Sequence, residues 1–97
     1  MRGVILSRRA VRDVRRIGRG PVLAQIEEAL ERLAADAANL DIKLLAGAAP
    51  WRRLRVGDYR VLYRPIDTME SGDSEARWLV ARIVDRRDLE RAVSTLK

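Results

Sequence analysis

The chain has 97 residues, of which 47% are hydrophobic and 35% are charged, so it can form one globular domain around one core. Twenty Lys and Arg residues against fourteen Asp and Glu residues give a net charge of +6, and all but two of the basic residues are Arg. There is no apolar run near the roughly 20 residues of a membrane span, no signal-peptide core and no cysteine. We therefore expect a single domain over residues 1–97, located in the reducing cytoplasm and without membrane association.

The chain contains no histidine, which excludes several classes of catalytic and metal site. A Ser-His-Asp triad, a histidine metal ligand and an imidazole acid–base pair all require this residue. Catalysis would therefore depend on Arg, Lys, Tyr or a carboxylate. We expect neither a metal ion nor any other cofactor.

The first half of the chain predicts a strand followed by two helices. Residues 3–6 are an apolar run typical of a buried strand, and Ser7 is suited to cap the next helix. Gly18 is suited to end that helix and Pro21 to begin the second, over about 21–37. The short link predicts an antiparallel helical hairpin. Apolar residues at helical spacing mark the buried faces: Ala10, Val11, Val14 and Ile17 in the first helix, and Val22, Leu23, Ile26, Leu30 and Leu33 in the second.

The second half of the chain predicts three strands and a final helix. The expected segments are a connector over 38–50 with Leu44 and Leu45 pointing inward, a β-hairpin over 51–64, a loop over 67–77, a strand over 78–84, and a helix capped by Asp88 that packs through Leu89, Ala92, Val93 and Leu96. The resulting order is β-α-α-β-β-β-α. It predicts an α+β fold in which helices cover a sheet of antiparallel hairpin strands.

The predicted hairpin alternates between two faces. Gly57-Asp58 suits a type II′ turn, which would pair Val56 with Tyr59 and Arg55 with Arg60. Paired residues share a face, and successive residues alternate between faces. The apolar face therefore holds Leu54, Val56, Tyr59, Val61 and Tyr63, with Arg52 at its end, and the basic face holds Trp51, Arg53, Arg55, Arg60, Leu62 and Arg64.

The basic face favours an anion as its partner. Arg55 is expected opposite Arg60, and like charges in this position cost stability, by a few tenths to about 1 kcal/mol. The alternative is a solvated face neutralised by carboxylates from elsewhere in the chain. Within the hairpin no carboxylate lies on this face, which favours anion binding. Nucleic acid is the expected anion for a basic, arginine-rich chain.

The hairpin and the segments around it resemble the RelE/ParE toxin superfamily. The matching signatures are Leu45, Gly47, Trp51-Arg52, Leu54 to Tyr63, the strand 79–84 and Asp85-Arg86-Arg87-Asp88. The order of elements matches over nearly the whole chain. The resemblance implies a toxin of a type II toxin–antitoxin pair. RelE-like members cut messenger RNA in the ribosomal A site, and ParE-like members poison DNA gyrase.

The resemblance also implies roles for individual residues. In RelE-like nucleases, the 2′-hydroxyl of the RNA attacks the adjacent phosphate on a concave basic face, and arginines can stabilise the developing negative charge. The implied catalytic residues are Arg60 at the scissile phosphate, Arg53 and Arg55 on the strand, and Arg87, favoured over Arg86, as the second phosphate-stabilising arginine. The implied RNA-binding residues are Arg64, Arg86, Arg8, Arg12, Arg15 and Arg16. The four in the first helix could equally belong to a solvated surface that forms part of the antitoxin groove.

The chain departs from the RelE-like pattern at Glu90, where many RelE-like nucleases have a tyrosine. Glu90 is either a general base or an exposed helix residue. The missing tyrosine and the long helical hairpin favour a ParE-like gyrase inhibitor, whereas the arginines favour a ribosome-dependent mRNA endonuclease. We take the endonuclease as the first hypothesis, the gyrase inhibitor as the second, and a degenerate toxin-fold binding protein as the third. The expected partners are messenger RNA, the ribosome, and an acidic, partly disordered antitoxin in a hetero-oligomer, which would complement the positive charge.

Overall fold

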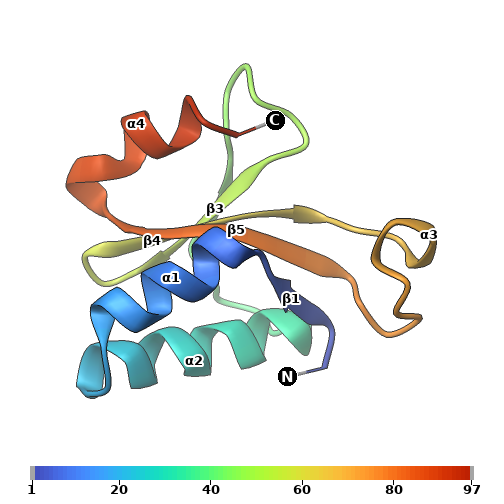
Figure 1. Ribbon diagram of the computed structural model, residues 1–97, viewed down its shortest axis with the longest axis horizontal. Helices are drawn as coiled ribbons and strands as arrows, with labels where there is room; N and C mark the ends of the chain where they lie inside the picture. Colours follow the sequence, from blue (N-terminus) through green and yellow to red (C-terminus); the bar gives the residue numbers. More distant parts are fainter. Residues whose placement is uncertain (1, 97) are drawn as a thin grey trace.

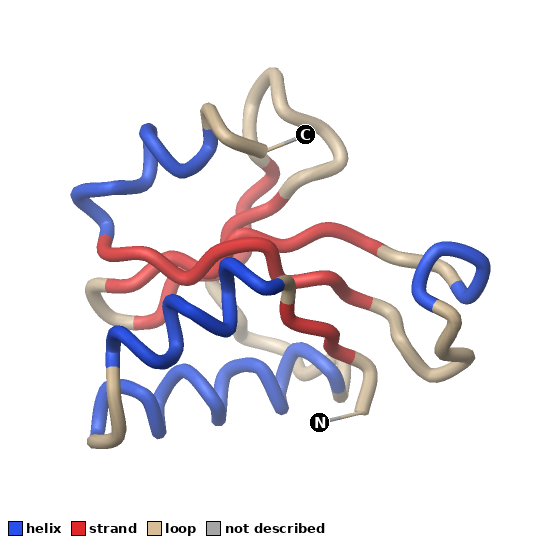
Figure 2. The backbone as a smooth tube through the Cα atoms, viewed as in Figure 1, coloured by secondary structure: helices blue, strands red, loops and turns tan. Residues whose placement is uncertain are grey.

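The computed structural model describes residues 2–96 as a five-stranded sheet with helices on both faces (Figures 1 and 2). The strands are β1 (Val4–Leu6), β2 (Ile42–Leu44), β3 (Arg52–Val56), β4 (Tyr59–Pro65) and β5 (Trp78–Asp85). The helices are α1 (Arg8–Ile17), α2 (Pro21–Ala34), α3 (Thr68–Ser71) and α4 (Leu89–Val93), with a 3-10 turn over Arg86–Asp88. Helices α1 and α2 lie on one side of the sheet and α4 on the other (Figure 1). The predicted α+β fold is confirmed.

The strands are arranged in the order β1-β5-β4-β3-β2. Neighbouring strands are antiparallel except β1 and β5, so β1 adds a parallel edge strand to the predicted antiparallel strands. Parallel strands need a crossover connection. Among residues 2–96, no helix has the length and apolar character needed to cross a lipid bilayer.

The β3–β4 hairpin has the register that the sequence predicts. Val56 pairs with Tyr59 and Arg55 with Arg60. Gly57 has a φ of 57°, whereas Asp58 is absent from the non-glycine residues with positive φ in the described chain. A positive φ at the first turn position alone is the property of a type II′ turn. The alternation of the two hairpin faces is therefore confirmed.

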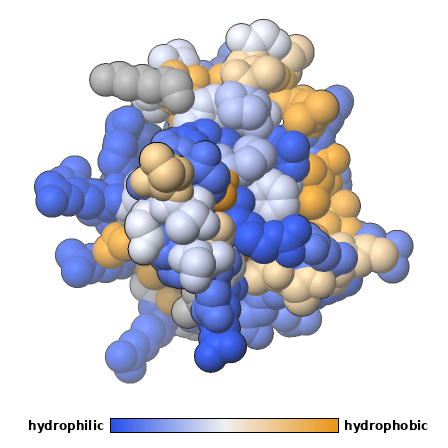
Figure 3. Space-filling view, turned by 90° about the vertical axis from the view of Figure 1, so that its right-hand side faces the viewer, coloured by the Kyte–Doolittle hydropathy of each residue, from blue (hydrophilic) through white to orange (hydrophobic). Residues whose placement is uncertain are grey.

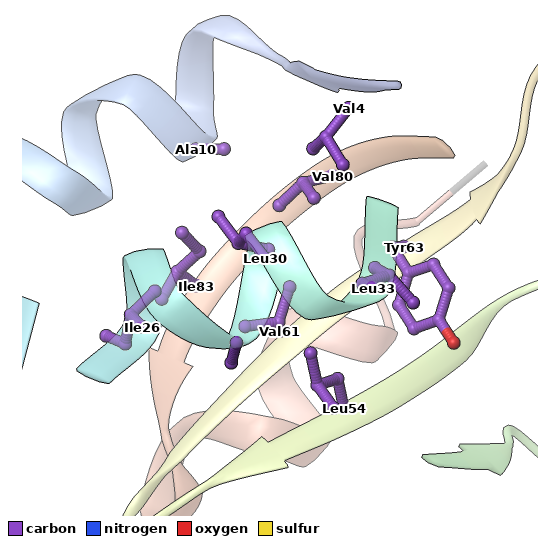
Figure 4. Close-up of a cluster of buried hydrophobic side chains, with 11 residues drawn as sticks. Val4, Ala10, Ile26, Leu30, Leu33, Leu54, Val61, Tyr63, Val80 and Ile83 are labelled. Atoms are coloured by element: carbon purple, nitrogen blue, oxygen red, sulfur yellow. The ribbon is translucent and has the colours of Figure 1, made fainter. Parts of the chain in front are cut away.

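The main core lies between α1, α2 and the sheet (Figure 4). Ile26, Leu30 and Leu33 of α2 face the sheet because they recur at helical spacing. Each such side chain, when fully buried, contributes about 1.5–3 kcal/mol. Their partners in this core are Val4, Ala10, Leu54, Val61, Tyr63, Val80 and Ile83. The expected core face of the hairpin is thus confirmed for Leu54, Val61 and Tyr63.

A second, smaller core lies beneath α4. Leu62 and Val84 are buried there with Ala92, and they pack against Leu45, Leu89, Val93 and Leu96. Leu62 belongs to the basic face of the hairpin, so α4 covers one part of that face and leaves the arginines beside it open. The packing role of the final helix is confirmed, although the helix ends at Val93, before Leu96.

Several local predictions were wrong, each for a local reason. Val22 is 43% exposed, because it lies in the first turn of α2, ahead of the stretch that packs on the sheet. Leu44 is 67% exposed, because it belongs to β2, a short edge strand that the connector was not expected to form. Helix α2 ends at Ala34, shortly before Asp36, which has a φ of 54°. Helix α3 occupies part of the predicted loop.

The predicted cap of the final helix was also wrong. The Asp88 side chain makes no capping hydrogen bond to α4. The Asp85 carboxylate accepts a hydrogen bond from the Arg87 backbone nitrogen instead, at 2.9 Å, and caps the 3-10 turn.

The edge of β5 is closed by side chains of α1 and of its N-cap residue, Ser7. β1 pairs with β5 only from Trp78 to Val80, so the remainder of that edge needs other hydrogen-bond partners. The Ser7 hydroxyl donates to the Ala81 carbonyl oxygen at 2.8 Å, and the Asp13 carboxylate accepts from the Ile83 backbone nitrogen at 2.9 Å. Asp13, 2% exposed, also accepts from Arg82 Nε at 2.9 Å. The burial of this aspartate, which lies among exposed arginines, was not predicted from the sequence.

Candidate nucleic-acid-binding site

Four arginines come together beside the β3–β4 turn, on the part of the sheet face that α4 leaves open. We call them the arginine cluster: Arg53, Arg55, Arg60 and Arg86. The Arg60 guanidinium donates hydrogen bonds to the carbonyl oxygens of Gly57 and Tyr59, both at 3.0 Å, which fix its position at the turn. The Arg86 backbone nitrogen donates to the Asp58 carbonyl oxygen at 2.8 Å, which holds the end of β5 against the same turn.

The positive charges of the cluster reinforce one another at Arg60. Partial burial, followed by the charges of Arg55, Arg53 and Arg86, lowers the pKa of Arg60 from its ordinary value, while Asp41 acts in the opposite direction. Arginine nevertheless stays protonated at any physiological pH. Burial is the largest cause of this pKa shift, and repulsion from the neighbouring guanidinium groups adds to it. A bound anion would relieve that repulsion.

Asp41 supplies a carboxylate to the basic face from outside the hairpin, and this contact was not predicted from the sequence. It directly precedes β2, and the β2–β3 pairing brings it to the cluster. One carboxylate oxygen accepts a hydrogen bond from Arg53 Nη1 at 3.1 Å, and the other lies 3.9 Å from Arg55 Nη1. The basic face is thus partly neutralised from outside the hairpin. Recognition of β2 as a strand beside β3 would have predicted this contact.

Arg64 lies on the same face of the hairpin but is engaged elsewhere. Its guanidinium makes a two-pronged ion pair with Glu70 of α3, which raises the pKa of Arg64, and its charge lies 5.6 Å from the centre of the Trp51 ring. Arg64 therefore tethers α3 to the sheet. It also lines a groove of about 400 Å³ between the start of α1 and the end of the described chain, together with Arg8 and Arg9.

Arg87, the favoured second arginine, is placed differently from Arg86. Its Nε donates to Asp85 at 3.1 Å, and this hydrogen bond raises the pKa of Arg87. The side chain lines a hollow of about 370 Å³ between α1 and α4, whose other lining residues include Tyr59 and Arg82. The structure thus brings Arg86, rather than Arg87, into the electrostatic surroundings of Arg60.

The arginines of α1 form a separate basic surface. All four predicted residues of this helix are exposed, and Arg16 lies 3.7 Å from Asp13. Within residues 2–96, Arg8, Arg12 and Arg15 have no ion pair. Because α1 belongs to the helical layer on the other side of the sheet, these residues are not part of the arginine cluster (Figure 1). Long hydrophilic side chains also project from the surface in the side view of Figure 3.

The proton-transfer candidates near the site differ in exposure. Glu90 is exposed in the first turn of α4, and its side chain has no ion pair within the described chain. Tyr63 is buried and Tyr59 packs against the main core, as their positions on the hairpin predict. Residues 2–96 hold no group of three or more acidic side chains arranged to bind a metal ion. The arginine cluster can bind a phosphate and stabilise negative charge on it.

Comparisons with known proteins agree with the fold. A family model described as "ParE toxin of type II toxin-antitoxin system, parDE" matches residues 4–90. Among solved structures, a chain of the RelB–RelE antitoxin–toxin complex from Methanococcus jannaschii is similar, with a TM-score of 0.66 and 19% sequence identity. The match covers 91% of this chain and 96% of that chain. No curated protein matches the sequence.

Proposed function

This chain belongs to the family of ParE toxins of type II toxin–antitoxin systems, and within that family we propose that its arginine cluster cuts messenger RNA on the ribosome and so inhibits translation. The observation that carries this proposal is the position of Arg60, which is fixed by two backbone carbonyls within a cluster of like charges. A phosphodiester supplies the missing negative charge, and its paired oxygens match the planar guanidinium group. The resemblance of the hairpin to RelE-like nucleases supports the same assignment.

The proposed reaction is a transfer of phosphate within the RNA. The 2′-hydroxyl oxygen attacks the adjacent phosphorus, and the bond between phosphorus and the 5′-oxygen breaks. The products are a 2′,3′-cyclic phosphate and a 5′-hydroxyl end. Arg60 stabilises the charge that develops on the phosphate oxygens, together with the other members of the cluster, Arg53, Arg55 and Arg86. Glu90 is our candidate to accept the proton of the 2′-hydroxyl, and water supplies a proton to the leaving oxygen.

Arginines outside the cluster would extend the contact with RNA. Arg8, Arg12, Arg15 and Arg16 on α1 and Arg64 beside its groove could bind further backbone phosphates. An antitoxin is the second proposed partner. The similar structure from Methanococcus jannaschii is itself an antitoxin–toxin complex, and an acidic antitoxin would complement the net charge of +6.

Induction of the chain in growing bacteria tests the proposal. We expect protein synthesis to stop while DNA remains undamaged, and messenger RNA to be cut inside codons. Filamentation and a DNA-damage response with intact messenger RNA would overturn the proposal. That result would support the second candidate, an inhibitor of DNA gyrase.

Two specific observations favour gyrase inhibition as the second candidate. The matching family model is named after ParE. In addition, the position where many RelE-like nucleases have a tyrosine is occupied by Glu90, a residue without any hydrogen bond to the cluster in the described chain. A gyrase inhibitor would need the surface of the protein but no proton acceptor.

Arg86 and Arg87 offer a matched comparison within the proposal. We expect Arg86→Ala to weaken the binding of single-stranded RNA about five-fold or more, because it removes a charge beside Arg60. Arg87→Ala removes the same charge from a residue held 3.1 Å from Asp85, a closer ion pair than the 3.9 Å between Arg86 and Asp58, and we expect less than half of that effect. Fluorescence anisotropy with labelled RNA measures both. Equal losses, or a larger loss for Arg87→Ala, would contradict the assignment of Arg86 to the cluster.

Glu90→Gln tests the proposed proton acceptor. Glutamine has nearly the same size as glutamate but cannot accept a proton at neutral pH, so we expect RNA cleavage to fall about 100-fold. RNA affinity should change little, because Glu90 is exposed and carries no ion pair in the described chain. The check is to measure cleavage on purified ribosomes together with RNA affinity. Cleavage at the parental rate would remove Glu90 from the mechanism.

A further inference from the structure

We infer that Asp41 is an internal counterion that occupies a phosphate-binding position between Arg53 and Arg55 and thereby limits how tightly the chain binds RNA. The inference rests on the proposed function, because it concerns the same arginine cluster. It assigns a role to a residue that neither the sequence motif nor the family resemblance singles out.

The backbone fixes Asp41 independently of its charge. The Asp41 carbonyl oxygen accepts a hydrogen bond from the Arg55 backbone nitrogen at 2.9 Å and another from Arg53 Nη1 at 3.2 Å. The next residue, Ile42, pairs with Leu54 across the β2–β3 ladder. The side chain of Asp41 is therefore presented to the cluster by the sheet itself, and a substitution that removes only the charge should leave this backbone in place.

The carboxylate is arranged as two phosphate oxygens would be. One oxygen lies 3.1 Å from Arg53 Nη1 and the other 3.9 Å from Arg55 Nη1, so a single anionic group bridges two guanidinium groups. Arginines bind phosphate by the same kind of charge-assisted hydrogen bonds. A backbone phosphate that approached both arginines would have to displace this carboxylate or share its partners.

The exposure of the three side chains indicates that such displacement is feasible. The side chain of Asp41 is 53% exposed and that of Arg55 56% exposed, whereas Arg53 is only 19% exposed. The carboxylate thus lies on the solvent side of Arg53, where an incoming anion can replace it. Ion pairs as exposed as this one contribute only about 0–1 kcal/mol, so an RNA phosphate can compete with it.

Asp41→Asn separates the charge from the fold. Asparagine retains an oxygen that can accept from Arg53, but it carries no negative charge. The matched control is Asp36→Asn, which removes the same charge from an equally exposed ion pair with Arg77, away from the cluster. Asparagine also tolerates the positive φ of Asp36. Asp41→Glu, the third variant, restores the negative charge at this position.

The probe is a short, fluorescently labelled single-stranded RNA with 2′-O-methyl riboses, which binds but cannot be cut by attack of the 2′-oxygen. We expect Asp41→Asn to bind about three- to ten-fold more tightly than the parent in low salt, and the difference to shrink as salt rises. Asp36→Asn should change the affinity less than about two-fold, and Asp41→Glu should return it close to the parental value. Expression of Asp41→Asn should also inhibit growth at lower induction than the parent.

The outcomes distinguish failure of this inference from failure of the proposed function. If the parent binds RNA and Asp41→Asn binds no more tightly, or if Asp36→Asn gains as much, Asp41 is not a specific counterion and the inference is overturned. Lost cleavage by Asp41→Asn without tighter binding would make Asp41 a proton acceptor instead of a counterion, which also overturns the inference. If neither folded protein binds the probe, the RNA-binding function itself fails.

Discussion

Replacing Asp13 with alanine is expected to lower the free energy of unfolding by about 3–5 kcal/mol, a large part of the 5–15 kcal/mol typical of a domain. The carboxylate is 2% exposed and accepts hydrogen bonds from Arg82 Nε, Arg82 Nη2 and the Ile83 backbone nitrogen. Alanine would leave a backbone donor without a partner at the edge of β5, together with a guanidinium group that is only 15% exposed. Both groups would be desolvated without compensation.

Urea denaturation followed by circular dichroism measures this effect. Asp13→Asn should lie between the parent and Asp13→Ala, because its amide oxygen can still accept from the Ile83 nitrogen and Arg82 Nε, while its amide nitrogen faces the donor Arg82 Nη2. Glu75→Ala is the control, since it breaks an exposed ion pair with Arg2 and should cost no more than about 1 kcal/mol. If Asp13→Ala were as stable as Glu75→Ala, the edge of β5 would not depend on α1.

Replacing Arg60 with alanine should reduce RNA cleavage at least about 100-fold, the magnitude found when one preorganised donor to a developing negative charge is removed. The two carbonyl hydrogen bonds that fix the guanidinium make Arg60 the best-positioned member of the cluster. The unfolding free energy should change by no more than about 0.5 kcal/mol, because the variant also relieves repulsion from Arg53 and Arg55.

Cleavage of ribosome-bound messenger RNA by the purified protein, with thermal unfolding measured in parallel, tests this prediction. Arg19→Ala is the matched control, since it removes the same charge from the exposed link between α1 and α2. It should retain nearly full activity. Parental activity in Arg60→Ala, or unfolding as the cause of its loss, would contradict the proposed role of Arg60.

The features that the sequence could predict are those that depend on short-range patterns. The alternation of the hairpin faces follows from a period of two residues on each side of Gly57, and it placed Arg55 opposite Arg60 correctly. The Ser7 cap, which accepts from the Ala10 nitrogen, and the start of α2 at Pro21 follow from equally local rules. Local sequence patterns were therefore sufficient to predict most of the helices and strands and the basic face of the hairpin.

The features that the sequence could not predict depend on contacts between distant segments. Asp13 is buried because β1 is too short to cover β5, which is visible only once the sheet is assembled. Asp41 reaches the arginines through β2, a strand of three residues without a recognisable pattern. Leu62 alternates with core residues and yet is buried, because α4 covers the other face. In each case the local sequence does not show what packs against the residue.

If the arginine cluster acts on an RNA phosphate, induction in growing cells should produce messenger RNA ends that carry a 5′-hydroxyl group, and mapping these ends tests this directly. We expect abundant new 5′-hydroxyl ends inside the codons of translated messages for the parent, and none above background for Arg60→Ala expressed at the same level. Growth arrest by the parent without such ends would contradict it.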